Sequence, residues 1–175
     1  MTRLVAFLRG INVGGHVVKK DRLEEAFTSL GFRGVVTYRQ SGNVIFEADD
    51  TDIDEVRARI EIKLRKTLGY EISVSIRSIT ELRALVERYS RPVNEGTSLL
   101  VTLLPAQVDR SALSLPLTIP KSTAVIYSSS GSEFFSLTHG GGEGGLPNPF
   151  LESRLKVKAT TRNMDVIKGL VEKFG

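Results

Sequence analysis

The sequence predicts an α+β fold made of two ferredoxin-like (βαββαβ) subdomains, each an antiparallel sheet with its helices mainly on one face. The first 78 residues alternate between apolar runs of strand length and helical stripes, in the order strand, helix, strand, strand, helix, strand. That order is the split βαβ unit. The remaining residues give a similar but less regular order. We therefore predict a ferredoxin-like subdomain at residues 1–78 and a degenerate α+β subdomain with a C-terminal helix at residues 79–175.

The elements of the first subdomain follow from apolar spacing and from cap residues. Residues 4–8 are continuously apolar, which is typical of a strand covered on both faces. Asp21 and Glu24 have the spacing of a capping box at the start of a helix. A second helix opens at Thr51 and ends at Gly69. The other predicted strands are residues 35–40, 43–47 and 72–76, the first two joined by a two-residue turn at 41–42.

The second subdomain has shorter elements separated by prolines and glycines. Its predicted helices are residues 80–89, 108–113, 149–155 and 164–174, and its predicted strands are residues 99–104, 124–127, 133–137 and 157–159. No repeat is detectable in the letters of the two halves. The similarity that we predict between them is therefore one of topology alone.

Composition and charge exclude several classes of function. The 175 residues carry 24 Lys and Arg against 20 Asp and Glu, a formal net charge of +4, without a basic or acidic tail. This balance argues against polybasic binding that neutralises many phosphates. The chain has no cysteine, which excludes disulfides, thiolate nucleophiles and iron–sulfur clusters. Its apolar runs are too short for a signal peptide or a membrane span, so we expect a cytoplasmic protein without membrane contact.

Three polar segments are candidate ligand contacts. Their residues are Arg9, Asn12, Gly14 and Gly15 in the first, Gln40, Ser41 and Asn43 in the second, and Thr161, Arg162 and Asn163 in the third. In the first, glycines directly after a strand let a ligand approach the backbone amides. The alternative is a flexible loop, since the spacing matches neither a Rossmann fingerprint nor a P-loop.

The other two segments also have a structural interpretation beside the functional one. The alternative interpretation of the second segment is simply a good hairpin turn, and the sequence favours it. In the third, Thr160 or Thr161 can cap the last helix, and the guanidinium of Arg162 offers paired donors to phosphate or carboxylate. Its alternative is a capped helix with an exposed arginine.

The motifs at residues 8–15 (LRGINVGG), 40–43 (QSGN) and 160–163 (TTRN) occur together in this order. With them the chain resembles a bacterial family of uncharacterised proteins, the domain of unknown function family numbered 1697. The resemblance implies two α+β subdomains similar to the ferredoxin-like fold. Because the family has no established activity, the resemblance implies no reaction. The family usually has a tryptophan where this chain has Met164, so a ligand-stacking role of that aromatic is not expected here.

These observations lead to three hypotheses. The first is binding of a small anionic or nucleotide-like ligand at the junction of the subdomains. The second is a purely structural or interaction role of the same polar residues. The third is binding of single-stranded RNA through an open sheet face, with Phe7, Tyr38 and Phe46 as stacking platforms. The sequence contains no recognisable catalytic constellation, which argues against an enzyme, and we expect neither a metal site nor a cofactor.

Overall fold

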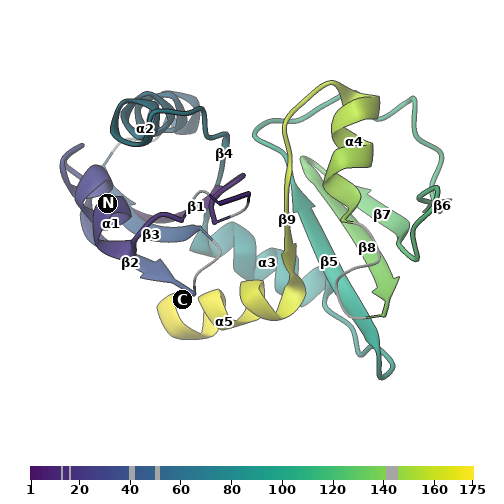
Figure 1. Ribbon diagram of the computed structural model, residues 1–175. Coiled ribbons are helices and arrows are strands. Elements are labelled where there is room, and N and C mark those ends of the chain that lie inside the picture. Colours follow the sequence, from purple (N-terminus) through teal and green to yellow (C-terminus); the bar gives the residue numbers. More distant parts are fainter. Residues whose placement is uncertain (13, 16, 40–41, 50–51, 141–145) are drawn as a thin grey trace. The chain divides into compact units, whose positions relative to one another are not determined.

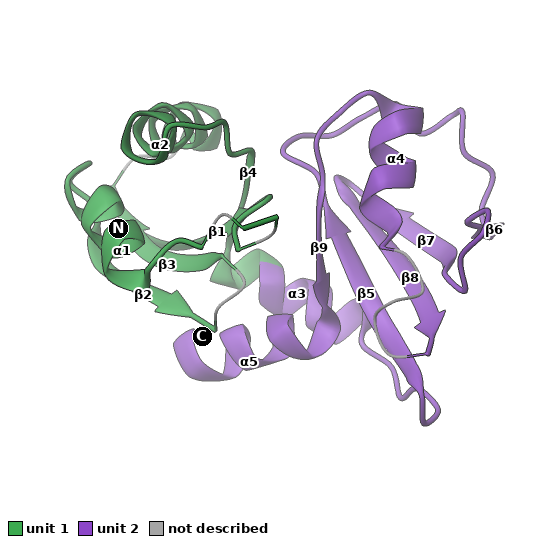
Figure 2. Ribbon diagram, viewed as in Figure 1, with its two compact units in different colours: residues 1–81 green, residues 82–175 purple. Residues whose placement is uncertain are grey.

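The computed structural model describes residues 1–12, 14–15, 17–39, 42–49, 52–140 and 146–175. The chain divides into two compact units, residues 1–81 and residues 82–175 (Figure 2). Each unit contains its own antiparallel sheet, so the predicted α+β fold is confirmed. The boundary predicted after Ser78 lies at the end of a strand, whereas the units divide within the helix that follows it.

Unit 1 has the connectivity of the split βαβ unit (Figure 1). Its elements are β1 (Thr2–Leu8), α1 (Lys20–Thr28), β2 (Arg33–Tyr38), β3 (Asn43–Ala48), α2 (Ile53–Leu68) and β4 (Val74–Ser78), followed by α3 (Ile79–Tyr89), which continues into unit 2. The strands are ordered β2-β3-β1-β4, so β1 and β3 are central and antiparallel. This strand order is the ferredoxin-like one that the sequence predicts.

The core of unit 1 lies between the sheet and its two helices. Alternate residues of β1, namely Leu4, Ala6 and Leu8, pack with the apolar stripes of α1 and α2. Phe27 of α1 lies with its ring centroid 5.4 Å from that of Phe46 of β3. The helices therefore cover one face of the sheet.

Unit 2 repeats the strand order of unit 1 with one added strand. Its elements are β5 (Thr97–Leu103), β6 (Leu117–Thr118), β7 (Val125–Ser130), β8 (Glu133–His139), α4 (Pro147–Leu155), β9 (Thr160–Asn163) and α5 (Met164–Phe174). The sheet order is β6-β7-β8-β5-β9. With β6 left out, the order β7-β8-β5-β9 corresponds strand by strand to the order β2-β3-β1-β4 of unit 1. Between β5 and β7, where every residue is described, there is no helix, so the one predicted at 108–113 is wrong.

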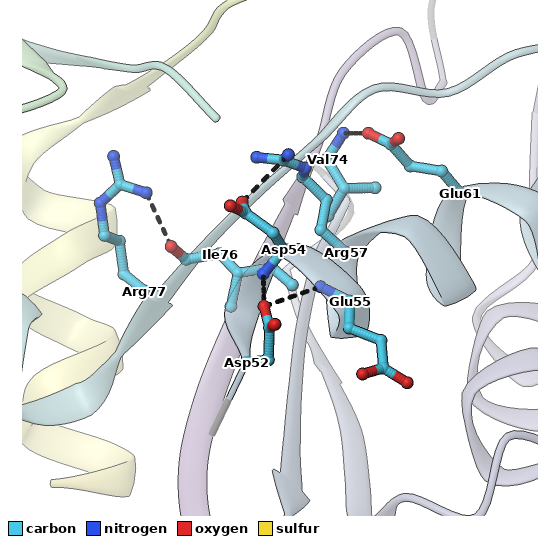
Figure 3. Close-up of polar contacts among 8 residues, drawn as sticks. All are labelled: Asp52, Asp54, Glu55, Arg57, Glu61, Val74, Ile76 and Arg77. Carbon is cyan, nitrogen blue, oxygen red and sulfur yellow. Dashed lines mark hydrogen bonds and ion pairs between the residues drawn. The ribbon is translucent and has the colours of Figure 1, made fainter. Parts of the chain in front are cut away.

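Equivalent hydrogen bonds recur in the two units. The Glu61 carboxylate on α2 accepts from the Val74 amide at the start of β4, with 2.9 Å between oxygen and nitrogen (Figure 3). In unit 2 the Glu152 carboxylate on α4 accepts from the Ala159 amide, just before β9, at 2.7 Å. Both helices thus use a carboxylate to hold the strand that follows them. The similarity between the units extends from topology to individual contacts.

Two helix starts differ from the predicted ones. The Asp21–Glu24 capping box does not form, because the Glu24 carboxylate accepts from the amide and hydroxyl of Thr37 on β2 at 2.8 and 2.9 Å. The N-cap position of α1 is Lys19, which makes no side-chain cap bond. Helix α5 is capped by the Asn163 side chain and not by a threonine. The predicted strand at 157–159 is displaced to β9, where Thr160 and its neighbours pair with β5.

The end of β1 is tied to the turn between β2 and β3. The Leu8 amide donates to the Gly42 carbonyl at 2.8 Å. Gly42 has a φ of +72°, and a Cβ placed there would lie 3.2 Å from the Leu8 Cβ and 3.3 Å from the Ile11 Cβ. Only glycine combines this conformation with this close approach. Unit 2 has the matching bond, from the Leu104 amide to the Ser132 carbonyl at 2.9 Å.

A glycine-to-alanine pair tests this constraint. Gly42→Ala should lower the free energy of unfolding by about 2–4 kcal/mol, because strain at positive φ adds to overpacking. Gly10 has a φ of +79° with nothing within 4 Å of an added Cβ. Gly10→Ala therefore introduces the backbone strain of a positive φ without overpacking. It should cost about 1–2 kcal/mol. Chemical denaturation measures both variants, and equal losses would contradict the close-packing argument.

Candidate functional site

The predicted site residues fall into both units. Unit 1 contains Arg9, Asn12, Gly14, Gly15 and Asn43, and unit 2 contains Thr161, Arg162 and Asn163. Gln40 and Ser41 lie outside the described residues. Within unit 1 the structure brings the first and second segments to one pocket. The idea that the third segment shares their site stays a prediction.

This pocket of unit 1 has a volume of about 600 Å³. It lies where the loop after β1, the start of α1 and the turn after β2 meet. The described residues that line it are Asn12, Val17, Val18, Lys19, Lys20, Asp21, Leu23, Thr37, Arg39, Gly42 and Asn43. Pockets that bind small molecules commonly span about 300–1,000 Å³. The volume therefore suits a metabolite-sized ligand.

Asn12 and Asn43 line this pocket and also hold its walls in place. Asn12 has a φ of +59°, a conformation that asparagine tolerates better than most residues. Its Oδ1 accepts from the Val18 amide at 2.8 Å, which ties these two residues together. The buried Asn43 donates from Nδ2 to the Tyr38 carbonyl at 3.0 Å across the β2–β3 turn. Two of the predicted contacts thus shape the pocket through bonds within the chain.

The positive charge of the pocket comes from three residues that were not predicted from the sequence. Lys19, Lys20 and Arg39 line it with exposed side chains, against one carboxylate, Asp21, among the described lining residues. Within the described part of the chain, neither Lys19 nor Lys20 makes an ion pair. In the sequence, two consecutive lysines stand at the start of an amphipathic helix, a pattern too common on protein surfaces to single them out.

Three other predicted contacts in unit 1 lie outside the walls of this pocket, as far as the described lining shows. Arg9 is half-buried, and its backbone amide donates to the Ser73 carbonyl at 2.9 Å. Gly14 and Gly15 have φ values of +61° and +85°, with nothing within 4 Å of an added Cβ. These two glycines therefore allow the loop to turn without packing against another segment.

Arg162 of unit 2 is buried among bonds of its own strand. Its guanidinium donates to the Thr160 hydroxyl at 2.7 Å and to the Thr161 carbonyl at 3.0 Å. Burial lowers the pKa of Arg162 to about 10, so the side chain stays charged at neutral pH. Arg77 on β4 is its counterpart in unit 1. It is also buried and donates to the carbonyl of the residue before it, Ile76, at 2.7 Å (Figure 3).

The other residues of the third segment bond within unit 2. The Thr161 hydroxyl lies 2.8 Å from the Thr102 hydroxyl and 3.2 Å from the Asn148 Oδ1 on α4. Asn163 accepts from the Asp165 amide at 2.9 Å as the cap of α5. These bonds join β9 to β5, α4 and α5. Thr161, Arg162 and Asn163 thus all have hydrogen-bond partners within unit 2.

The rings expected to stack RNA bases are largely unavailable. Phe46 packs inside the core of unit 1, with its centroid 4.7 Å from that of Phe32. Phe7 is fully buried, and Tyr38 is half-buried with the Arg39 guanidinium 5.4 Å from its ring centroid. The expectation of exposed rings at Phe7 and Phe46 is wrong, because both side chains are needed to fill buried space.

The described residues contain no group of three or more His, Asp or Glu side chains placed to hold a metal ion. No helix among them is both long and apolar enough to cross a lipid bilayer.

Comparisons with known proteins agree with the fold. No curated protein matches the chain. A conserved bacterial protein, SP0830 from Streptococcus pneumoniae, has a similar solved structure, with a TM-score of 0.67 and 22% sequence identity over 98% of this chain and 97% of that one. The family model described as "Protein of unknown function (DUF1697)" matches residues 1–129, which include every described residue of the pocket. The chain therefore belongs to the DUF1697 family of proteins of unknown function.

Proposed function

We propose that this protein binds a small anionic ligand in the pocket of unit 1, with Lys19, Lys20 and Arg39 supplying the charge. The observation that carries the proposal is the clustering of these three cations around a metabolite-sized volume. The net charge of the whole chain is only +4, so this is a local concentration of charge. Cations that line a concave surface raise the local concentration of anions more than cations on a flat one do.

The chemistry of the cations favours an oxyanion. Ammonium and guanidinium groups donate charge-assisted hydrogen bonds to phosphate and carboxylate oxygens. Lys19 and Lys20 are adjacent at the start of α1, and Arg39 follows β2. Positive side chains therefore line two walls of the pocket. Neither lysine is engaged with a described carboxylate. A ligand would therefore not have to displace an ion pair of either lysine.

The rigid part of the site comes from the two asparagines. Asn12 holds the loop after β1 through Val18, and Asn43 holds the β2–β3 turn through Tyr38. These bonds hold both asparagines in place before a ligand arrives, which reduces the entropy that they lose on binding. In this proposal Asn12 and Asn43 position the walls and the cations bind the ligand.

The structural alternative is supported for the third segment. Arg162 donates to two oxygens of its own strand, and Arg77 occupies the equivalent place in unit 1. An arginine thus stands at the equivalent position of both units and makes the same bond to the preceding carbonyl. The fold that the two units share explains this recurrence. We assign Arg162 and Arg77 a stabilising role.

Charge removal tests the proposed site. In thermal-shift and calorimetric titrations with pyrophosphate, ribose 5-phosphate and nucleoside monophosphates, at least one anion should stabilise the protein. Lys20→Ala and Arg39→Ala should each weaken its binding about fivefold, a loss of about 1 kcal/mol. Lys66→Ala, which removes an exposed lysine of α2 away from the pocket, is the matched control. Binding should also weaken with added salt.

Three outcomes would contradict this proposal. They are a panel in which no anion shifts the melting temperature, binding that survives removal of all three pocket cations, and equal losses in Lys66→Ala and Lys20→Ala.

The stabilising role of the buried arginines has its own test. Arg162→Met and Arg77→Met should each lower the free energy of unfolding by about 2–4 kcal/mol, because each change leaves buried oxygens without their donor. Arg83→Met on the exposed side of α3 is the control and should be nearly neutral. Anion affinity, measured by calorimetry on the folded variants, should stay at the wild-type value. Unchanged stability together with lost affinity would place Arg162 in a binding site instead.

A further inference from the structure

We infer that the anion bound in the pocket of unit 1 is a nucleoside monophosphate, with its phosphate on the cations and its base on an apolar wall. This inference rests on the proposed function and adds the class of ligand. Three features of the pocket carry it: its volume, its apolar side chains and its carboxylate.

The volume is too large for a bare anion. At about 30 Å³ per water-sized group, the five non-hydrogen atoms of inorganic phosphate fill roughly 150 Å³. The pocket measures about 600 Å³. Most of it would stay filled with water around a phosphate, whereas a phosphate that carries a ribose and a base is several times larger. A ligand of that size can reach the cations and the remaining walls together.

One part of the wall is apolar. Val17, Val18 and Leu23 line the pocket beside the cations. Val17 is 81% exposed, the highest value among the large apolar side chains that the described residues expose. Because Val17 is so exposed, its side chain contributes little to the stability of the free protein. A planar base placed against it would remove apolar surface from water. A sugar phosphate without a base has no group that would benefit from this side chain.

The carboxylate of Asp21 disfavours a ligand that is anionic throughout. Asp21 is exposed and lines the same pocket as the cations. An ionised carboxylate only accepts hydrogen bonds and repels phosphate. It suits a ligand that offers a donor some distance from its anionic group. Ribose hydroxyls and exocyclic amino groups are such donors, so a nucleoside monophosphate satisfies all three features.

The experiment compares ligands that differ only in the base. Calorimetry measures the dissociation constants of the four common ribonucleoside monophosphates and of ribose 5-phosphate with the full chain. The best nucleotide should bind at least tenfold more tightly than ribose 5-phosphate. Val17→Asn should remove most of this difference while the affinity for ribose 5-phosphate stays unchanged, and Val17→Ile should retain it. Lys20→Ala should weaken both kinds of ligand by the same factor.

The outcomes separate this inference from the proposed function. Equal affinity for ribose 5-phosphate and every nucleotide overturns the inference and leaves anion binding in place. The inference also fails if a nucleotide preference persists unchanged in Val17→Asn. Absence of binding by every anion tested overturns the proposed function, and the inference with it. The melting temperatures of the free variants show whether each one is folded, and Val17 is exposed enough that both replacements should fold.

Discussion

The backbone hydrogen bond from the Leu8 amide to the Gly42 carbonyl fixes the geometry on which the pocket of unit 1 depends. It joins the end of a central strand to the turn that connects β2 and β3. Because a side chain at Gly42 would press on Leu8 and Ile11, the two segments approach as closely as backbone allows. Ile11 and Asn12, which follow β1, are thereby held near Gly42, and the start of α1 lines the same pocket.

The recurrence of this bond in unit 2 shows how much of the arrangement belongs to the fold. Leu104 and Ser132 are joined in the same way as Leu8 and Gly42. Unit 2 nevertheless differs at the next step, because the segment from β5 to β7 contains the short strand β6 and no helix. Without a counterpart of α1 there is no equivalent of the adjacent lysines at its start. The pocket of unit 1 therefore arises from a connection that the two units do not share.

The sequence predicted the elements whose pattern is local. The apolar stripe after Met164 gave a helix at 164–174, which coincides with α5, and the run at 4–8 falls within β1. The cap of α1 could not be predicted in this way. Glu24 has the right spacing for a capping box, yet its carboxylate bonds to Thr37 on β2, a partner that only the folded chain supplies.

The candidate site was predictable to a similar extent. Asn12 and Asn43 were selected because glycine-rich loops and hairpin turns are recognisable in a sequence, and both line the pocket. Lys19, Lys20 and Arg39 were not, because lysines and arginines are common on any surface and only their convergence gives them meaning. Arg162 illustrates the opposite case. The sequence offers it either as a ligand contact or as an exposed arginine beside a helix cap, whereas the alternation of side chains along β9 directs it into buried space beside Thr160.

The carboxylates that hold the outer strands have a consequence for behaviour at high concentration. The edge strands β2 and β4 of the unit 1 sheet each have an amide, Thr37 and Val74, that already donates to a glutamate of a covering helix. An open strand edge invites pairing with another chain, which begins aggregation. Glu24 and Glu61 occupy donors that such an incoming strand would need. The same two side chains that organise the sheet thus help to keep crowded copies of the protein apart.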